Sequence, residues 1–333
     1  MTTATTVQTP PRAPEFASAA APRDLEFDAA LLSRHDQSGP RYTSYPTAPQ
    51  FDASFDERAY REHALATNDD PIPRPLSLYL HMPFCASPCF YCGCNRVITR
   101  DRSKGESYLA RLHREIALQG ELFDRDRRVV QLHLGGGTPN FFDIAQYEQL
   151  FDALGAAFTL AGRGEREFSV ELDPRHADRD YVHALARLGF NRASLGVQDF
   201  DHEVQVAINR VQSVKETLEV IAATREAGFE SVSIDLIYGL PKQNAAGFGR
   251  TLDTVIEAQP DRIALYSYAH LPELFKAQRQ IEPAELPSPA AKLSLLGLAI
   301  ERLGAAGYRY IGMDHFARAD DELARALDER TLQ

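Results

Sequence analysis

The chain has 333 residues, with 44% hydrophobic and 25% charged side chains, as expected of a globular protein with a full core. Its net charge of −11 and its scattered Lys and Arg argue against a surface for nucleic acid or for anionic membranes, and we expect neither as a partner. We see neither the ~18 uninterrupted apolar residues of a membrane span nor a secretory signal, so a cytoplasmic enzyme is predicted.

The N-terminal segment is predicted to lie outside the core. Residues 1–34 are rich in Thr, Ala and Pro and cannot bury enough apolar surface to fold, which predicts a disordered tail. Residues 35–75 include the polar and aromatic run "GPRYTSYPTA" and are predicted to form an arm with a small helical segment. Judged from its residues alone, this run is a solvated linker.

From residue 76 onward, short apolar runs alternate with segments of helical spacing. Strands are predicted at 76–82, 129–134, 167–172, 192–198, 231–237, 262–268 and 308–316. Helices are predicted at 104–123 and near 143–158, 178–188, 213–227, 247–258 and 289–306. This alternation predicts a parallel sheet with right-handed crossovers. The expected fold class is α/β, an open partial (β/α)6-type barrel over residues 76–317.

All four cysteines lie in one stretch, "YLHMPFCASPCFYCGCN" at residues 79–95. Disulfides are disfavoured in a chain without a secretory signal and at spacings this short. Structural zinc usually takes two separated pairs of ligands, whereas these four are compressed into C-x3-C-x2-C-x-C. An iron–sulfur cluster is favoured, because three thiolates at this spacing can hold four irons and leave one iron open for a small molecule.

Further candidate residues follow later strands, at the face where barrels place their active sites. "GGGTP" (135–139) is either a tight strand–helix connection or a backbone site that a ligand can approach closely. Glu171 could grip a ribose or a cation, or join a helix N-cap network with Asp173. The same choice between ligand contact and structural pairing applies to Gln198, Asp199, Arg210 and Asp235. His81 and His133 lie on apolar strands and are predicted to be core histidines.

The cysteine spacing and several longer segments resemble the oxygen-independent coproporphyrinogen III oxidase family of the radical S-adenosylmethionine (SAM) superfamily. C-x3-C-x2-C on the loop after a first barrel strand is the signature of that superfamily. The wider likeness covers roughly residues 35–333 and rests on "GPRYTSYPTAPQF", "LHLGGGTPNFF", "SVELDPR", "GFNRASLGVQDF", "IDLIYGLPKQ", "YSYAHLPELFKAQRQI" and "GYRYIGMDHFARADDELA". The fourth Cys and the RYTSYP run distinguish this family from most other radical SAM proteins, including its haem-chaperone branch.

The resemblance implies a set of site residues. The ligands of a [4Fe-4S] cluster would be Cys85, Cys89 and Cys92, with SAM on the open iron. The contacts of that SAM would be Tyr79, Gly136 and Glu171. The residues implied around a second SAM, which this family can hold, are Tyr91, Gly137, Thr138, Gln198, Arg210, Asp235 and Ala269. The candidate catalytic residues are Tyr79, Glu171 and Cys94. Cys94 is not expected to ligate iron, and a role in the reaction and simple packing stay open for it.

The resemblance also implies a reaction and its partners. A 5′-deoxyadenosyl radical from SAM would drive oxidative decarboxylation of two propionates of coproporphyrinogen III, giving the vinyl groups of protoporphyrinogen IX. A reducing electron-transfer protein such as flavodoxin or ferredoxin would supply electrons, and the protein is expected to be a monomer. Arg41 is a candidate to meet the substrate propionates, because a planar guanidinium suits a carboxylate.

One departure from the family pattern lies at the C-terminus. The family continues into a helical domain that closes the site, so residues 318–333 are expected to be the start of a truncated C-terminal helical domain. Two alternatives therefore stay open. The first is a haem- or SAM-binding protein of the haem-chaperone type without decarboxylase turnover, and the second is a structural protein with a zinc loop.

Overall fold

The structure, a computed structural model, describes residues 27–35 and 47–332. Within these residues a parallel sheet runs in chain order through β1 (Leu76–Met82), β4 (Arg128–Gly136), β6 (Glu167–Leu172), β7 (Arg192–Gln198), β8 (Ser231–Tyr238) and β9 (Arg262–Ser267). The short β5 (Thr159–Leu160) pairs beside β4. Among the described strands, β1 and β10 end the path without pairing to each other, so the barrel is open. The predicted α/β partial barrel is confirmed.

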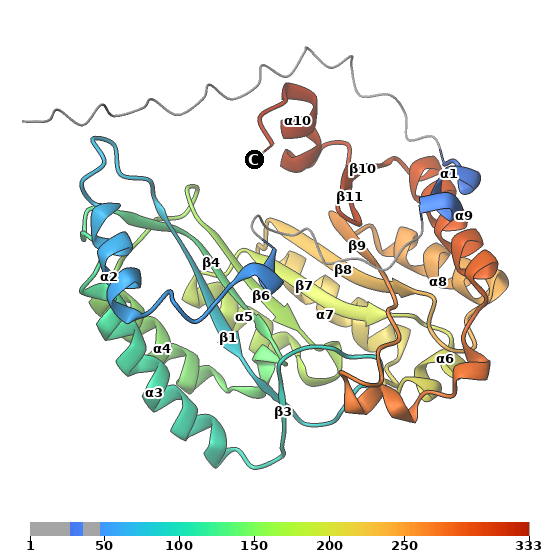
Figure 1. Ribbon diagram of the computed structural model, residues 1–333, viewed down its shortest axis with the longest axis horizontal. Helices are drawn as coiled ribbons and strands as arrows, with labels where there is room; N and C mark the ends of the chain where they lie inside the picture. Colours follow the sequence, from blue (N-terminus) through green and yellow to red (C-terminus); the bar gives the residue numbers. More distant parts are fainter. Residues whose placement is uncertain (1–26, 36–46, 333) are drawn as a thin grey trace, which may run out of the picture.

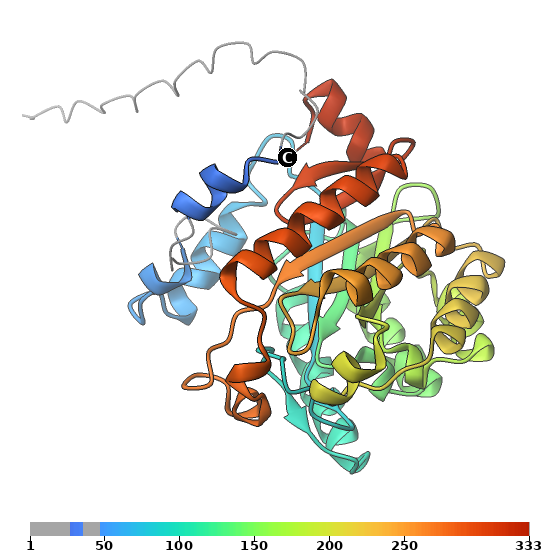
Figure 2. The same cartoon turned by 90° about the vertical axis from the view of Figure 1, so that its right-hand side faces the viewer.

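Helices between the strands cover the outer face of the sheet (Figures 1 and 2). They are α3 (Ser103–Gly120), α4 (Ile144–Ala157), α5 (Arg179–Leu188), the short α6 (His202–Ala207), α7 (Val214–Glu226), α8 (Ala245–Ala258) and α9 (Pro289–Ala305). Sequence signals at their first turns explain where two of them begin. Asp143 with Gln146 and Ser213 with Glu216 form capping boxes that satisfy the free N–H groups of α4 and α7.

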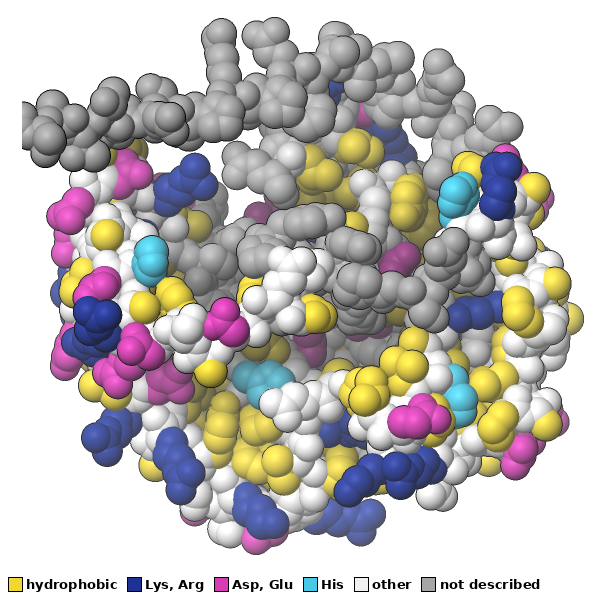
Figure 3. All heavy atoms as spheres, in the orientation of Figure 1, with side chains coloured by type: hydrophobic (Ala, Val, Ile, Leu, Met, Phe, Trp, Pro, Cys, Tyr) yellow, Lys and Arg dark blue, Asp and Glu magenta, His cyan; other side chains and the backbone are white. Residues whose placement is uncertain are grey.

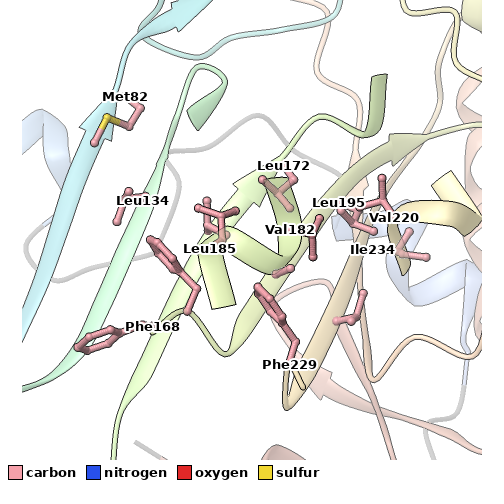
Figure 4. Close-up of a cluster of buried hydrophobic side chains, with 14 of the residues drawn as sticks. Met82, Leu134, Phe168, Leu172, Val182, Leu185, Leu195, Val220, Phe229 and Ile234 are labelled. Atoms are coloured by element: carbon pink, nitrogen blue, oxygen red, sulfur yellow. The ribbon is translucent and has the colours of Figure 1, made fainter. Parts of the chain in front are cut away.

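The core lies between the sheet and these helices. Figure 4 shows Phe168 and Leu172 of β6 in one apolar cluster with Val182 and Leu185 of α5, and all four are nearly or completely buried. Alternate residues of each strand supply this apolar layer, because successive side chains of a strand point to opposite faces. The remaining alternate positions carry polar side chains on the inner face of the barrel, which is where the candidate site lies.

The prediction of a single strand over residues 308–316 is wrong. The chain forms a hairpin of β10 (Tyr308–Gly312) and β11 (His315–Arg318) here, and β11 pairs antiparallel with β9. Met313 and Asp314 have φ of +48° and +69°. Two successive residues with positive φ make the tight turn that joins antiparallel strands, so the chain reverses here instead of continuing as a seventh parallel strand.

Both ends of the chain carry helices. Residues 29–34, predicted to be part of a disordered tail, belong to α1 (Ala29–His35), which contacts α9, so the tail prediction is wrong for this stretch. Residues 1–26 of that tail, and residues 36–46 of the arm with Arg41, lie outside the described residues. The arm segment contains α2 (Glu57–Ala66), and the C-terminal segment contains α10 (Glu322–Glu329). The division of the chain into these segments stays a prediction. None of the helices that the structure describes is long and apolar enough to cross a bilayer.

Candidate active site

The cysteine loop is closed at its base by a small parallel ladder that the sequence did not reveal. β2 (Phe84–Cys85) pairs with β3 (Val97–Ile98), and Thr99 N donates to Cys85 O at 2.9 Å. Thr138 N, from the glycine-rich turn, donates to Phe84 O at 2.9 Å. These bonds bring the two ends of the loop together and fix them to the end of β4.

The side chain of Arg96 bonds to the backbone of the cysteine loop. Its guanidinium donates to the carbonyl oxygens of Cys89 at 3.2 Å, Cys92 at 3.0 Å and Cys94 at 3.4 Å. One planar group with several donors can satisfy carbonyls that a short loop would otherwise leave unpaired. This role could not be predicted, because a single Arg after a cysteine motif has no distinctive spacing.

Each of the three predicted ligand sulfurs accepts a hydrogen bond. Thr138 Oγ1 donates to Cys85 Sγ at 3.2 Å, Arg210 Nη1 to Cys89 Sγ at 3.7 Å, and Cys94 N to Cys92 Sγ at 3.4 Å. Donors aimed at thiolate sulfurs stabilise their charge and tune the potential of an iron–sulfur cluster. The donor set therefore fits a cluster held by Cys85, Cys89 and Cys92.

Cys94 differs from the other three cysteines. It is exposed, whereas Cys85 and Cys89 are buried and Cys92 is half-buried. A hydrogen bond from the Cys94 thiol lowers the pKa of Cys92 to about 6, and the same bond, with burial, raises the pKa of Cys94 well above its usual range. Cys94 is thus a donor to the Cys92 sulfur, and the expectation that Cys94 does not bind iron stays a prediction.

A zinc loop would need a different arrangement. Within residues 27–35 and 47–332, no three His, Cys, Asp or Glu side chains converge on a position for one metal ion. A structural zinc site gathers four ligands within about 2.3 Å of a single ion. In a four-iron cluster each thiolate binds a different iron, so the sulfurs stay farther apart. The choice of a cluster over a zinc loop stays a prediction.

Glu171 is fixed at the end of β6 by donors from β4. Its Oε1 accepts from His133 Nε2 at 3.1 Å and its Oε2 from Gly136 N at 3.1 Å. His133 Nδ1 lies 2.6 Å from Ser169 Oγ, which sets the ring with its Nε2–H toward the carboxylate. Asp173 serves a different network, so Glu171 is not part of a helix N-cap. Its side chain is 40% exposed and keeps lone pairs free for a ligand.

Tyr79 completes this group from β1. Its ring stacks on His133 with centroids 5.6 Å apart, and its hydroxyl lies 3.1 Å from His81 Nδ1. His81 Nε2 lies 2.8 Å from Asn95 O in the cysteine loop. The prediction of two core histidines is wrong: both are half-exposed on the inner face. The alternation in "LSLYLHM" indicates that His81 lies on the same face as Tyr79, because the two residues are two positions apart in a strand.

The glycines of "GGGTP" leave space that the site needs. A Cβ on Gly135 would lie 2.6 Å from Glu171 Oε1, and one on Gly136 would lie 2.4 Å from the His81 ring. Gly136 also has a φ of +114°, which side chains disfavour. A Cβ on Gly137 would lie 2.7 Å from Pro83 O. The run is therefore more than a tight connection, because it lets β4 approach both the cysteine loop and Glu171.

A second group of predicted residues gathers around Gly196 of β7. A Cβ there would lie 2.9 Å from Gln198 Nε2 and 3.1 Å from Arg210 Nη2. Asp235 is the residue opposite Gly196 on β8, and its Oδ1 accepts from Ser194 Oγ at 3.1 Å. Tyr91 and Ala269 are joined by Gln278 Nε2, which donates to both carbonyls, at 2.9 and 3.1 Å. All of these residues lie near the carboxyl ends of the strands.

Two polar residues in this region have structural partners. Arg210 pairs with Asp173 at 3.0 Å and donates to Gly196 O at 2.6 Å. Asp199 is fully buried and accepts from Thr251 Oγ1 and Gln243 Nε2, both at 2.6 Å. Asp199 therefore belongs to the packing of α8 against the sheet. Arg210 both forms an ion pair and touches Cys89.

Asp235 should make the stability of the chain depend on pH. Burial, and next the charge of Glu171, raise the pKa of this part-buried carboxyl to about 7. In the unfolded chain the Asp235 carboxyl ionises near pH 4. The free-energy cost of burying its charge therefore grows as pH rises from about 4 to 7, and it is constant above pH 7. Asp235→Asn should therefore raise the free energy of unfolding by about 2–4 kcal/mol at pH 8. The increase at pH 5 should be smaller than the increase at pH 8 by about 2 kcal/mol. Urea titrations at both pH values measure this, and an equal effect at both would contradict it.

Comparison with known proteins agrees with this geometry. The profile of the Radical SAM superfamily matches residues 79–255. Over 312 residues the chain is 51% identical to the oxygen-independent coproporphyrinogen III oxidase of Pseudomonas aeruginosa, covering 93% of this chain and 67% of that protein. The Escherichia coli protein of the same name is 47% identical over 310 residues, covering 93% and 66%. The chain belongs to the oxygen-independent coproporphyrinogen III oxidase family.

A solved member of this family has the same fold. The structure of E. coli coproporphyrinogen III oxidase (HemN), described as a radical SAM enzyme, matches with a TM-score of 0.84 at 46% identity and covers 91% of this chain and 67% of that one. The chain thus spans about two thirds of the length of these relatives. The resemblance drawn from the motifs is confirmed, and so is the assignment to a family of radical SAM oxidoreductases. The individual residue roles stay predictions.

Proposed function

We propose that this protein carries out the oxidative decarboxylation of two propionate side chains of coproporphyrinogen III, giving the vinyl groups of protoporphyrinogen IX. The observation that carries this proposal is that each of three sulfurs, those of Cys85, Cys89 and Cys92, accepts at least one hydrogen bond. The three cysteines would hold a [4Fe-4S] cluster with SAM there, and these groups would supply the one-electron radical chemistry that the reaction at the propionates needs. The chain's own residues hold, orient and shield these groups.

Glu171 and Gly136 are suited to hold the SAM bound to the cluster. His133 and Gly136 use one lone pair on each oxygen of Glu171, and the remaining lone pairs can accept from an amine or a ribose hydroxyl. Tyr79 presents a 59% exposed ring beside them, close to the cysteine loop through its contact with His81. Positions held by this many contacts restrict the motion of a bound reactant, which is the main contribution of a protein to radical chemistry.

A second SAM is proposed for the region around Gly196. Gln198, Arg210 and Asp235 converge there, and the backbone of Gly137 and Thr138 follows the carboxyl end of β4, which β6 separates from β7. An amide, a guanidinium and a carboxyl can recognise an adenine edge, a carboxylate and an amine. Equilibrium dialysis of the reconstituted protein should give two SAM per chain. Asp235→Asn should weaken only the second, and a stoichiometry of one would remove this part of the proposal.

The deciding experiment is an anaerobic assay of the reconstituted chain with dithionite, SAM and coproporphyrinogen III. It follows 5′-deoxyadenosine and the vinyl product together, because the two report different steps. Both products support the proposal. Deoxyadenosine without vinyl product would show a radical generator that does not process this substrate. Tight haem binding with neither product would favour a haem-binding protein instead. Location in the cytoplasm and a monomeric state stay predictions.

A further inference from the structure

Basic side chains gather around the cysteine loop. Segments 95–106 and 271–280 carry six Lys or Arg and three Asp or Glu, although the whole chain has 36 basic and 47 acidic residues. Exposed members of this group include Arg100, Lys104 and Lys276, the last on η4 (Lys276–Gln280). In Figure 3 several Lys and Arg side chains lie along the lower part of the view. We call these segments the loop patch.

Three exposed cations of the loop patch have no carboxylate within ion-pair distance among the described residues. Arg100, Lys104 and Lys276 form no ion pair among the residues that the structure describes, whereas Arg128, Arg250, Arg302 and Arg309 all pair with carboxylates elsewhere. Unpaired cations on an acidic chain produce a local positive potential against a negative background. Such an asymmetry attracts and orients an acidic partner before contact.

The same surface exposes apolar side chains. Val97 is 44% exposed and Ile98 41%, both on β3, and Leu274 is 72% exposed beside Lys276. Apolar residues surrounded by charged ones are the usual composition of a transient protein interface, since the apolar part loses water and the charged rim sets orientation. A small-ion or nucleotide site would not need these exposed apolar groups.

The loop patch is joined to the loop that carries the thiols. Gln278 Nε2 donates to Tyr91 O at 2.9 Å, and a Cβ on Gly93 would lie 3.0 Å from the Phe275 ring. β3 pairs with β2, which contains Cys85. A protein seated on the loop patch therefore lies against the segments that surround the predicted cluster ligands, so an electron would have a short path to them.

We propose that the loop patch is the docking surface for an acidic electron-carrier protein of the flavodoxin or ferredoxin type. This inference rests on the proposed function, which needs one electron for each SAM that is cleaved. The carrier gives up that electron and is itself oxidised by one, and the electron passes to the group held by Cys85, Cys89 and Cys92. The anionic surface of the carrier matches the unpaired cations, and its apolar contact covers Val97, Ile98 and Leu274.

The test reverses charges that have no structural partner. The variant Arg100→Glu/Lys104→Glu/Lys276→Glu removes three cations of the loop patch, and the matched control Arg74→Glu/Arg163→Glu/Arg187→Glu reverses three other exposed cations that form no ion pair among the described residues. Binding of a purified flavodoxin to the reconstituted holoenzyme is measured at 50 and 300 mM salt, with a ferredoxin as a second probe. We expect the loop-patch variant to bind about tenfold or more weakly at low salt, and to lose most of the salt dependence that the control keeps.

A second readout separates docking from chemistry. Dithionite is a small reductant and needs no docking surface, so dithionite-driven formation of 5′-deoxyadenosine should be equal in the variant, the control and the unchanged protein. Formation driven by reduced flavodoxin should fall about tenfold only in the loop-patch variant. Equal binding of either carrier to the variant and the control would overturn the docking proposal. Failure of dithionite to give deoxyadenosine in the unchanged protein would instead overturn the proposed function, while the binding comparison would still decide the surface.

Discussion

Cys89→Ser is expected to abolish assembly of the cluster, whereas Cys94→Ser is expected to preserve it. The Cys89 sulfur is buried and lies 3.7 Å from the Arg210 guanidinium, which suits a thiolate bound to iron. Cys94 is exposed, and its side chain and its N–H both donate toward Cys92. A serine hydroxyl can still donate there but cannot replace a ligand thiolate at position 89.

Iron and sulfide content after anaerobic reconstitution measures this difference. The unchanged chain and Cys94→Ser should bind about four irons, and Cys89→Ser less than about one. Formation of 5′-deoxyadenosine should fall by roughly a thousandfold or more in Cys89→Ser, because no open iron site remains. Circular dichroism of both variants provides the folding control. Full iron content in Cys89→Ser together with loss of iron in Cys94→Ser would mean that Cys94 is the third ligand.

Most of the fold could be predicted from the alternation of apolar and polar residues in the strands. The centre of the site could be predicted from the cysteine spacing. Each predicted strand from 76 to 268 overlaps an observed strand, because a strand with one apolar face shows apolar residues at every second position of the sequence. Glu171 and Asp235 could be placed at one end of the barrel from topology alone, since parallel strands end at the same edge. Cys85, Cys89 and Cys92 were evident from their spacing.

What the sequence could not show depends on contacts between distant segments. The contacts of Arg96 with three loop carbonyls and of Ser169 with His133 arise only when the chain is folded. The hairpin after Tyr308 was missed because Met313 and Asp314 are not the Asn-Gly or Asp-Gly pair that usually marks such a turn. His133 was misjudged because its neighbours Leu132 and Leu134 suggested burial, although they point to the opposite face.

Arg210→Met is expected to lower the free energy of unfolding by about 3 kcal/mol, the lower end of the range for breaking a buried ion pair. The change leaves Asp173 without its contact at 3.0 Å and Gly196 O without its donor at 2.6 Å, but Arg175 still holds Asp173. Burial alone would raise the pKa of Asp173. The hydrogen bonds from Arg175 and the charges of both arginines outweigh it and hold that pKa well below its usual range.

A double-mutant cycle with Asp173→Asn shows whether the two residues act as a pair. The loss in Arg210→Met/Asp173→Asn should be smaller than the sum of the single losses by about 1–3 kcal/mol, because the double variant removes both members of the Arg210–Asp173 pair. Asp173 contributes stability above the pH at which it ionises in the unfolded chain, near 4, and loses it as pH falls toward its lower folded pKa. The cost of Arg210→Met should therefore be full at pH 7 and shrink below pH 4. Additive losses that do not change with pH would show that Arg210 is retained for its contacts with Cys89 and a bound ligand, and that its pairing with Asp173 contributes little.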